Sequence, residues 1–429
     1  MTADRRWLAG FAALCVGQFL AHQTALSFSA LIPILKDEWH LSASETGLIL
    51  GVFQLGQTAA YVGVGFLLDR LRTKPIMVIS SAMVGAGDLL FALGAHDFAS
   101  GLLLRMLAGA LLGGLYLPAL KHIAETTPRP QRGVATGIYV GVSVAAYAAP
   151  LVYVGLLAPA IGWRATMVAV GLAELLGAYV LARDVQDAPQ PARPQERARF
   201  SRYVGDVLAN PAARSVILAY TGHNWELFGM WGWMGPFMVA SLIARGSSAR
   251  TALVTGGVLA AAVIGLGGII GAVAGGHLSD RLGRPRAAML MLAASLPCSL
   301  AFGWLFHAPL AFVITIGLVY GTVVLADSPA YSASLMELVP SRSLGGAFSI
   351  QMLFGWTATV VAPIAFGGIL DLVRALSPHP ATAWGAAFGL MALGPLVGLL
   401  ALRRFKRAAV QPRHLDSLEA KRHPETART

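Results

Sequence analysis

Twelve long apolar runs, separated by short polar segments, make up most of the chain. Each run has about 20 residues or more, the length at which an α-helix crosses the hydrocarbon core of a membrane. The pattern therefore predicts an all-α integral membrane protein with 12 transmembrane helices. The runs cover residues 7–34, 47–68, 75–95, 99–123, 133–158, 163–182, 215–243, 251–277, 286–306, 309–338, 344–372 and 382–402.

One short phrase occurs twice. Gly-Phe-Leu-Leu-Asp-Arg at 65–70 recurs as Gly-His-Leu-Ser-Asp-Arg at 276–281, so the two aspartates are 211 residues apart. A signature repeated at half the chain length predicts two pseudo-symmetric six-helix bundles. Membrane transporters are commonly built from such repeats, with the substrate site between them.

The polar segments divide the chain into four parts. The predicted bundles occupy residues 1–183 and 214–402, and a Pro-rich, charged segment at 184–213 has the composition of a linker. Residues 403–429 are basic and polar, which is typical of a solvated tail.

The charges show which way the chain crosses the membrane. Only 12% of the residues are charged, yet the net charge is +11. If the N-terminus is cytoplasmic, the inside segments hold 25 Lys and Arg residues and the outside segments hold 5. This positive-inside bias predicts cytoplasmic termini in a cell (inner) membrane protein, and no nucleic-acid partner.

Other chemistry has little support in the sequence. Cys15 and Cys298 both lie inside apolar runs, so neither a disulfide framework nor metal-ligand spacing is present. No phosphate-binding loop and no nucleophile set is apparent. We therefore expect no cofactor, no metal and no enzymatic activity.

Ionisable groups inside a membrane are costly, so each one is a functional candidate. In the fourth run, Arg105, Gly109 and Tyr116 have the spacing of one helical face, as do Gln18 and His22 in the first run. We expect Gln18, His22, Arg105 and Tyr116 to bind substrate. The alternative for Arg105 is a guanidinium that reaches outward to the membrane surface.

The seventh run carries His223 and Glu226 three residues apart, with Trp225 and other aromatic residues around them. Three-residue spacing places both ionisable groups on one helical face. A carboxyl group among aromatic rings suits a proton carrier, so we expect Glu226 to couple protons and His223 and Trp225 to bind substrate. The alternative is an internal hydrogen bond between His223 and Glu226.

The tenth run presents Tyr320, Asp327 and Tyr331 on one face, and Pro329 interrupts the helix just after the aspartate. Discontinuous helices expose backbone groups that bind polar substrates. We expect Asp327 to couple protons and the two tyrosines to bind substrate. Asp88 and Glu174 are also embedded in apolar runs, and the sequence leaves open whether they are structural or coupling residues.

With twelve spans, a duplicated six-helix unit and its loop phrase, the chain resembles the major facilitator superfamily. The second copy of the phrase matches that family's loop signature closely, whereas the first has Arg72 where glycine is usual. The resemblance implies a central cavity lined by helices 1, 4, 7 and 10. It also implies a latch that stabilises an outward-facing state. The alternative is that the arginines serve only as positive-inside topology signals. The latch residues would be Gly65, Asp69, Arg70, Gly276, Asp280, Arg281, Gly283 and Arg284.

Two further segments narrow the resemblance. Arg105-x-x-x-Gly109 is similar to a signature of proton-coupled members, and the stretches 223–229 and 326–329 are similar to permeases of the cyanate and small-anion group. We therefore expect a monomeric secondary transporter in the lipid bilayer. It would move a small polar solute, an organic or inorganic anion, by proton-coupled rocker-switch alternating access. A proton-driven drug or metabolite exporter and a non-transporting receptor or sensor are the alternatives.

Overall fold

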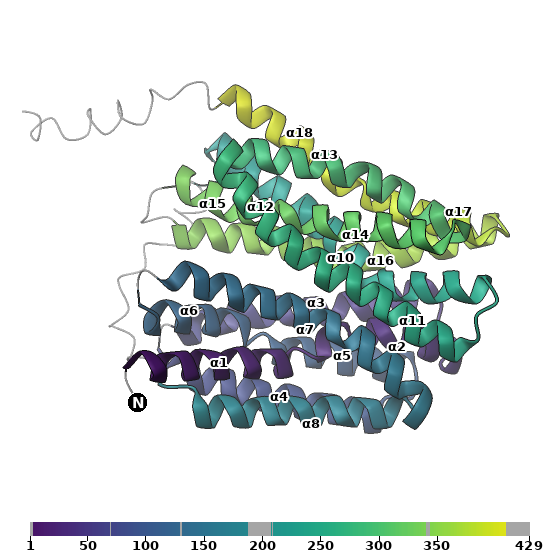
Figure 1. The fold of residues 1–429 in the computed structure, drawn as a ribbon, viewed down its shortest axis with the longest axis horizontal. Helices are drawn as coiled ribbons and strands as arrows, with labels where there is room; N and C mark the ends of the chain where they lie inside the picture. Colours follow the sequence, from purple (N-terminus) through teal and green to yellow (C-terminus); the bar gives the residue numbers. More distant parts are fainter. Residues whose placement is uncertain are drawn as a thin grey trace, which may run out of the picture.

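The computed structural model describes residues 3–68, 70–128, 131–187, 207, 209–339 and 344–408. These residues form helices joined by short turns, without a strand among them. Twelve helical segments of this part of the chain are long and apolar enough to cross a membrane (Figure 1). The predicted all-α membrane fold is confirmed, and the predicted ends of the spans are correct to within five residues.

The first six spans form the N-terminal half, drawn in purple to blue in Figure 1. The first span consists of two helices, and so does the fourth. The helices are α1 (Ala3–Ala21), α2 (Thr24–Glu38), α3 (Ala43–Leu68), α4 (Thr73–Gly94), α5 (Phe98–Leu112), α6 (Tyr116–Thr126), α7 (Arg132–Ile161) and α8 (Trp163–Asp184).

The last six spans form the C-terminal half, which follows the first half by way of residues 185–210. Most of the predicted linker and of the predicted tail lies outside the described residues. The helical elements are α10 (Pro211–Ala244), α11 (Ala249–Ala261), the π-helical segment η2 (Ala262–Gly267), α12 (Gly268–Leu282), α13 (Arg284–Phe302), the 3₁₀ segment η3 (Gly303–His307), α14 (Leu310–Ala326), α15 (Ser328–Leu338), α16 (Leu344–Leu376), α17 (Pro380–Met391) and α18 (Leu393–Ala408).

Four of the described spans are divided into two helices near their middle. The tenth breaks at Asp327, as predicted from Pro329, but the breaks at 22–23, 113–115 and 392 were not predicted. The break at 113–115 contains two consecutive glycines, which are poor helix formers. The expectation that Arg105 and Tyr116 share one continuous helical face is therefore wrong.

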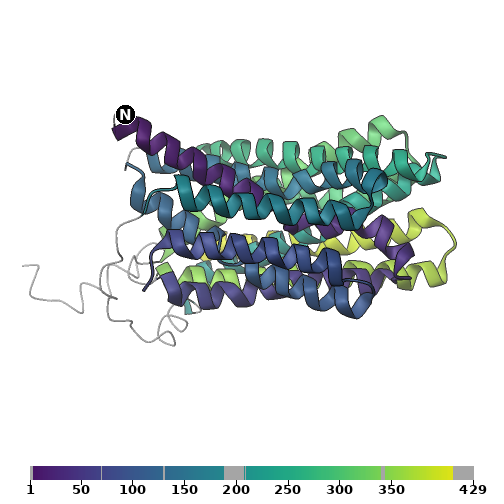
Figure 2. The same ribbon diagram turned by 90° about the horizontal axis from the view of Figure 1, so that it is seen from below.

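The two ends of the bundle differ in how the halves meet. We call the end at which α1 begins the terminus side, and the end that carries residues 39–42 and 245–248 the far side (Figures 1 and 2). On the far side, α3 packs on α16 through glycines. A Cβ at Gly47 would lie 2.3 Å from the Pro363 carbonyl oxygen, and one at Gly367 would lie 2.1 Å from the Ala43 carbonyl oxygen. Only glycine permits backbones to approach so closely.

The second contact between the halves, between α7 and α11, is also made through glycines. A Cβ at Gly155 would lie 2.6 Å from the Leu253 carbonyl oxygen, and one at Gly257 would lie 2.0 Å from the Leu151 carbonyl oxygen. Glycine contacts of this kind therefore join the halves along both interfaces on the far side.

Polar groups join the halves at the same end. The Asp371 carboxylate, near the end of α16, accepts hydrogen bonds from the backbone N–H groups of Ala43 (3.0 Å) and Ser44 (2.7 Å). The Ser44 hydroxyl donates a further bond of 2.7 Å. Asp371 thus caps the N-terminus of α3, where unpaired N–H groups and the helix dipole favour a negative charge.

On the terminus side, the glycines of the described residues make no such close contacts between the halves. A Cβ added at Gly63 or Gly65 of α3, at Gly137 or Gly141 of α7, or at Gly276 of α12 would meet no atom within 4 Å in the described part of the chain. The same helices that touch on the far side therefore stand apart here. The halves are closed on the far side and separated on the terminus side.

The cap on α3 gives a testable prediction. Replacing Asp371 by Asn removes the charge at the helix N-terminus and weakens far-side closure by about 1 kcal/mol. Spin labels at His96, in a far-side turn of the N-terminal half, and at Ala249, the first residue of α11, should show more long distances in double electron–electron resonance.

Asp97→Asn is the matched control, because Asp97 caps α5 entirely within the N-terminal half. Hydrogen bonds from Ser100 lower the pKa of this exposed carboxyl group, so it is charged in the parent protein. Equal distance distributions in the Asp371→Asn variant and this control would contradict the role assigned to Asp371.

Candidate functional site

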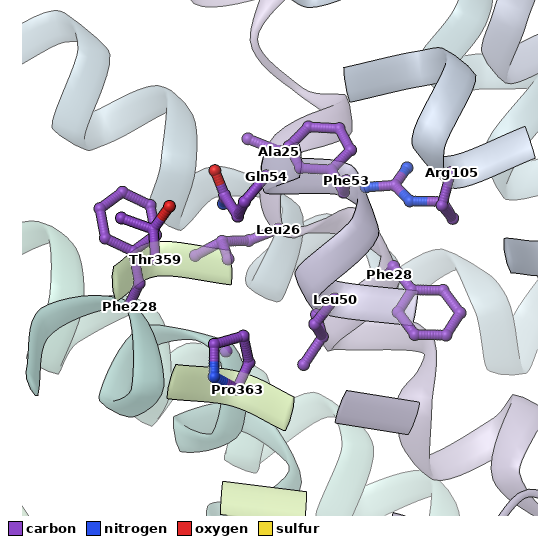
Figure 3. A pocket seen from close by; sticks show the side chains of 11 residues that line it. Ala25, Leu26, Phe28, Leu50, Phe53, Gln54, Arg105, Phe228, Thr359 and Pro363 are labelled. Atoms are coloured by element: carbon purple, nitrogen blue, oxygen red, sulfur yellow. The ribbon is translucent and has the colours of Figure 1, made fainter. Parts of the chain in front are cut away.

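A cavity lies between the two halves, about 16 Å from the start of α3 at the level of Gln54, near the middle of a membrane. Its walls come from α2, α3 and α5 on one side and from α10 and α16 on the other (Figure 3). The lining residues are Ala25, Leu26, Phe28, Leu50, Phe53, Gln54, Arg105, Phe228, Gly232, Thr359 and Pro363.

Aromatic side chains bridge the halves near this cavity. The rings of Tyr147 in α7 and Trp231 in α10 have centroids 5.3 Å apart. Tyr61 in α3 meets Trp356 in α16 edge-on at 4.9 Å. Each pair brings one residue from either half, so the two halves share an aromatic layer.

Polar groups of the first span lie next to this layer. The ring of His22, in the break between α1 and α2, is 6.2 Å from that of Tyr147. Gln18 Nε2 is 3.2 Å from His22 Nε2 and donates to the Ser143 hydroxyl at 3.1 Å. Three buried polar atoms, His22 Nδ1, Gln54 Oε1 and Gln57 Oε1, have no hydrogen-bond partner among the described residues.

Arg105 is buried beside the cavity rather than directed outward, so the surface-reaching alternative is wrong. Its guanidinium carbon lies 4.5 Å from the centroid of the Phe53 ring. Nη2 donates to the Thr24 carbonyl oxygen at 2.7 Å, and Nη1 lies 3.7 Å from Asp88 Oδ1. Its Nε is buried with no partner in the described part of the chain.

In the C-terminal half, Asp327 contacts two other predicted site residues. His223 Nδ1 lies 2.8 Å from Asp327 Oδ1, and the Tyr331 hydroxyl donates to Asp327 Oδ2 at 2.6 Å. All three side chains are buried. The acidic partner of His223 is therefore Asp327, which lies between α14 and α15. It is not Glu226, which is on the same helix as His223.

Glu226 forms a separate group beside this one. It accepts hydrogen bonds from the hydroxyls of Ser295 and Ser299 in α13, and the Tyr320 hydroxyl donates to Ser299 at 3.2 Å. Neutral hydroxyl donors thus surround the carboxyl group, which is 1% exposed.

Of the eight residues predicted to bind substrate, Arg105 lines the cavity and the other seven do not, Trp225 and Tyr116 among them. The Trp225 indole N–H donates to the Leu390 carbonyl oxygen at 3.2 Å, inside the C-terminal half. Tyr116 begins α6, and its ring is 5.9 Å from that of Tyr139 in α7. Neither belongs to the residues that line the cavity.

The polar face of α3 was not predicted from the sequence. Gln54, Gln57 and Tyr61 follow a spacing of three and four residues, which places them on one helical face. Gln57 Nε2 donates to the Tyr61 hydroxyl at 3.1 Å. Three polar groups on one face of an otherwise apolar run were the signal that could have revealed this wall.

The two loop phrases differ for a backbone reason. Gly283, between α12 and α13, has φ +80° and ψ 149°, a conformation restricted to glycine. Arg72, at the same junction of the first copy, has φ −67° and ψ 149°, which any residue adopts. The second copy therefore requires its glycine, whereas the first tolerates arginine. Asp69 lies outside the described residues.

The charged residues of the second phrase pair within their own half. Arg284 forms ion pairs with Asp280 and, at 3.2 Å, with Glu337 at the end of α15. Arg284 also donates to the Ser279 hydroxyl at 3.2 Å. In the first copy, the exposed Arg72 lies 3.8 Å from Asp187. None of these pairs joins the two halves.

Twelve spans in two halves around a buried cavity define a multi-pass membrane protein. The chain belongs to the Major Facilitator Superfamily, whose family model matches residues 14–326.

Individual relatives agree with this assignment. A probable sulfoacetate transporter of Cupriavidus necator is 25% identical, with 89% of this chain and 91% of that protein covered. A hexuronate transporter of Bacillus subtilis is 24% identical over 81% of this chain and 84% of its own.

Solved structures show the same fold. A bacterial homologue of the human lysosomal transporter Spinster superposes with a TM-score of 0.76 at 18% identity and covers 95% of this chain and 99% of its own. A D-xylose–proton symporter gives a TM-score of 0.65 at 17% identity, with 90% of this chain and 96% of its own covered.

The glycine of the second phrase can be tested by stability. Gly283→Ala forces a side chain into a glycine-only conformation and should destabilise the protein by about 1–3 kcal/mol. Thermal unfolding in detergent measures the loss. Arg72→Ala, at the matching junction with negative φ, should have little effect, and equal losses would contradict the backbone explanation.

The buried Asp327 group gives a second stability prediction. Asp327→Asn weakens charge-assisted contacts to His223 and Tyr331 and should cost about 1.5–3 kcal/mol. Asp280→Asn is the control, because the Asp280 side chain is 71% exposed and surface pairs contribute about 0–1 kcal/mol. Thermal unfolding of both variants measures the difference, and a larger loss for Asp280→Asn would be inconsistent with the assignment.

Proposed function

We propose that the protein is a secondary active transporter that moves a small organic anion by proton-coupled, rocker-switch alternating access. The observation that carries this proposal is the cavity between the halves, which places Arg105 opposite residues of the C-terminal half near the middle of the membrane. A solute held there touches both halves at once. Its binding energy can therefore bias how the halves are arranged.

The lining favours an anion with an apolar body. Among the lining residues, Arg105 has a buried Nε and Gln54 a buried Oε1 without a partner in the described part of the chain, and His22 Nδ1, beside the aromatic layer, is a further unpaired group. Phe53 and Phe228 provide apolar surface. The relatives named for sulfoacetate, hexuronate and 4-hydroxybenzoate support an organic anion, the last being 25% identical over 61% of this chain. We assign Gln18, His22 and Arg105 to substrate binding.

Glu226 and Asp327 are the proposed proton-coupling residues. A carboxyl group inside a membrane is costly to ionise without a cation beside it. The hydrogen bonds to Glu226 from the described residues come from hydroxyl groups, and Asp327 faces His223, a residue type that readily exchanges protons. Both groups are buried in the C-terminal half, next to the helix break at Asp327.

The arrangement of the halves fits one end of the transport cycle. With the termini in the cytoplasm, as the charge distribution predicts, the far side is external and the structure is inward-facing. Asp280 and Arg284 then pair only within their own half. In the outward-facing state, where the terminus side closes, the loop phrases would act as the latch.

Uptake into proteoliposomes tests this function. With an inward proton gradient, the purified protein should accumulate radiolabelled sulfoacetate, a hexuronate or 4-hydroxybenzoate at least about tenfold over gradient-free vesicles, a difference of about 1.4 kcal/mol. Arg105→Gln should abolish uptake, since it removes the cation. Glu226→Gln should keep exchange of labelled for unlabelled anion and lose gradient-driven accumulation.

Three results would contradict the proposal. Accumulation only under the opposite gradient would indicate an exporter, and binding without flux would indicate a receptor. Unchanged gradient-driven uptake by Glu226→Gln would remove Glu226 from proton coupling.

A further inference from the structure

A fully buried charged group lies in the N-terminal half, apart from Glu226 and Asp327. It consists of Asp88 in α4, Arg105 in α5 and Glu174 in α8, which meet at Thr24, the first residue of α2. Asp88 and Glu174 are 0% exposed and Arg105 is 1% exposed. Thr24 donates its hydroxyl to Asp88 Oδ1 at 3.0 Å and its backbone N–H to Glu174 Oε1 at 2.9 Å.

The carboxyl groups of Asp88 and Glu174 lie close together, because they bind the hydroxyl and the backbone N–H of the same residue, Thr24. An ionised carboxylate has acceptors only, so a bond between two of them requires a proton on one. Each group also keeps one buried oxygen, Asp88 Oδ2 and Glu174 Oε2, that no donor of the described residues reaches. A single proton shared by the pair would give both oxygens a partner.

The charges of the group balance only when that proton is present. Arg105 contributes one positive charge, and the carboxyl pair with one proton contributes one negative charge. Tyr153 in α7 is the other titratable side chain that faces the group. Without the proton, the site would hold an uncompensated negative charge in the membrane interior, which is strongly unfavourable.

We propose that Asp88 and Glu174 form a proton-binding site that takes up and releases the transported proton in the N-terminal half. The proposal rests on the proton coupling of the proposed function and adds a carboxyl pair to it. In the closed site, the pair holds one proton. When water reaches the site, an O–H bond of the pair breaks, and the proton passes to a water molecule.

The site is built into the backbone of the first span. The Thr24 N–H is one of the unpaired donors at the start of α2, and Glu174 satisfies it, while Arg105 binds the Thr24 carbonyl oxygen. The following residues, Ala25, Leu26 and Phe28, line the central cavity. Loss of the proton therefore acts on the residue that anchors one wall of the cavity.

The same helix also reaches the other half. The Ser29 hydroxyl of α2 donates to the Gly232 carbonyl oxygen of α10 at 2.7 Å. Gly232 lines the cavity as well. Displacement of α2 on deprotonation would thus change both the cavity wall and a contact between the halves.

Infrared spectroscopy of the protein in lipid tests the shared proton without a substrate. The parent protein should show a protonated-carboxyl band at neutral pH that shifts in D₂O. Glu174→Gln keeps the shape of the side chain and offers a donor to Asp88, so it should lose the part of the band that comes from the shared proton. Glu226→Gln should retain that part of the band. If Glu174→Gln does not fold, Asp88→Asn tests the same component, because its amide donates to an ionised Glu174. A band unchanged in the folded variant would overturn the proposal.

Transport of sulfoacetate, a hexuronate and 4-hydroxybenzoate into proteoliposomes tests the coupling. Glu174→Gln should retain anion exchange and lose gradient-driven accumulation, down to the level of gradient-free vesicles. Full gradient-driven accumulation by this variant would overturn the coupling role. If the parent protein accumulates none of these anions, the proposed function fails, and the infrared result still decides whether the pair holds a proton.

Discussion

The cost of placing a charge inside a membrane governs this structure. Buried ionisable side chains of the spans are met by a partner from another helix: Arg105 by Asp88, His223 by Asp327 and Glu226 by two serines. These contacts hold neighbouring helices together in each half. They also create the groups that can exchange a proton, because a charge so enclosed is stable only while its partner stays in place.

Glycine packing governs how the halves meet. On the far side, Gly47 and Gly367 bring α3 and α16 into backbone contact, whereas Gly63 and Gly65 on the same helix touch nothing among the described residues. A helix with small residues along its length can pack on its partner at either end. Closure at one end and separation at the other is the asymmetry that alternating access requires, and Asp371 adds a polar contact at the closed end.

Much of the fold follows from local sequence. The length of each apolar run predicted all twelve spans, and the duplicated phrase predicted two halves. The partners of the site residues did not follow. Spacing placed His223 and Glu226 on one face of α10, but their partners come from different helices. His223 pairs with Asp327 at the break in the tenth span, and Glu226 accepts a hydrogen bond from α13. Helical periodicity shows which residues share a face and is silent about which helix that face meets.

The sequence by itself determined the class of protein, the number of spans and the positions of embedded charges, because membrane insertion depends on hydrophobic length and charge along the chain. Only the tertiary structure decided which charges pair. It brought Asp88, Arg105 and Glu174, from three helices, to the backbone and hydroxyl of Thr24 at the break in the first span. That meeting depends on contacts between residues up to 150 positions apart, and no pattern along the chain encodes such a distance.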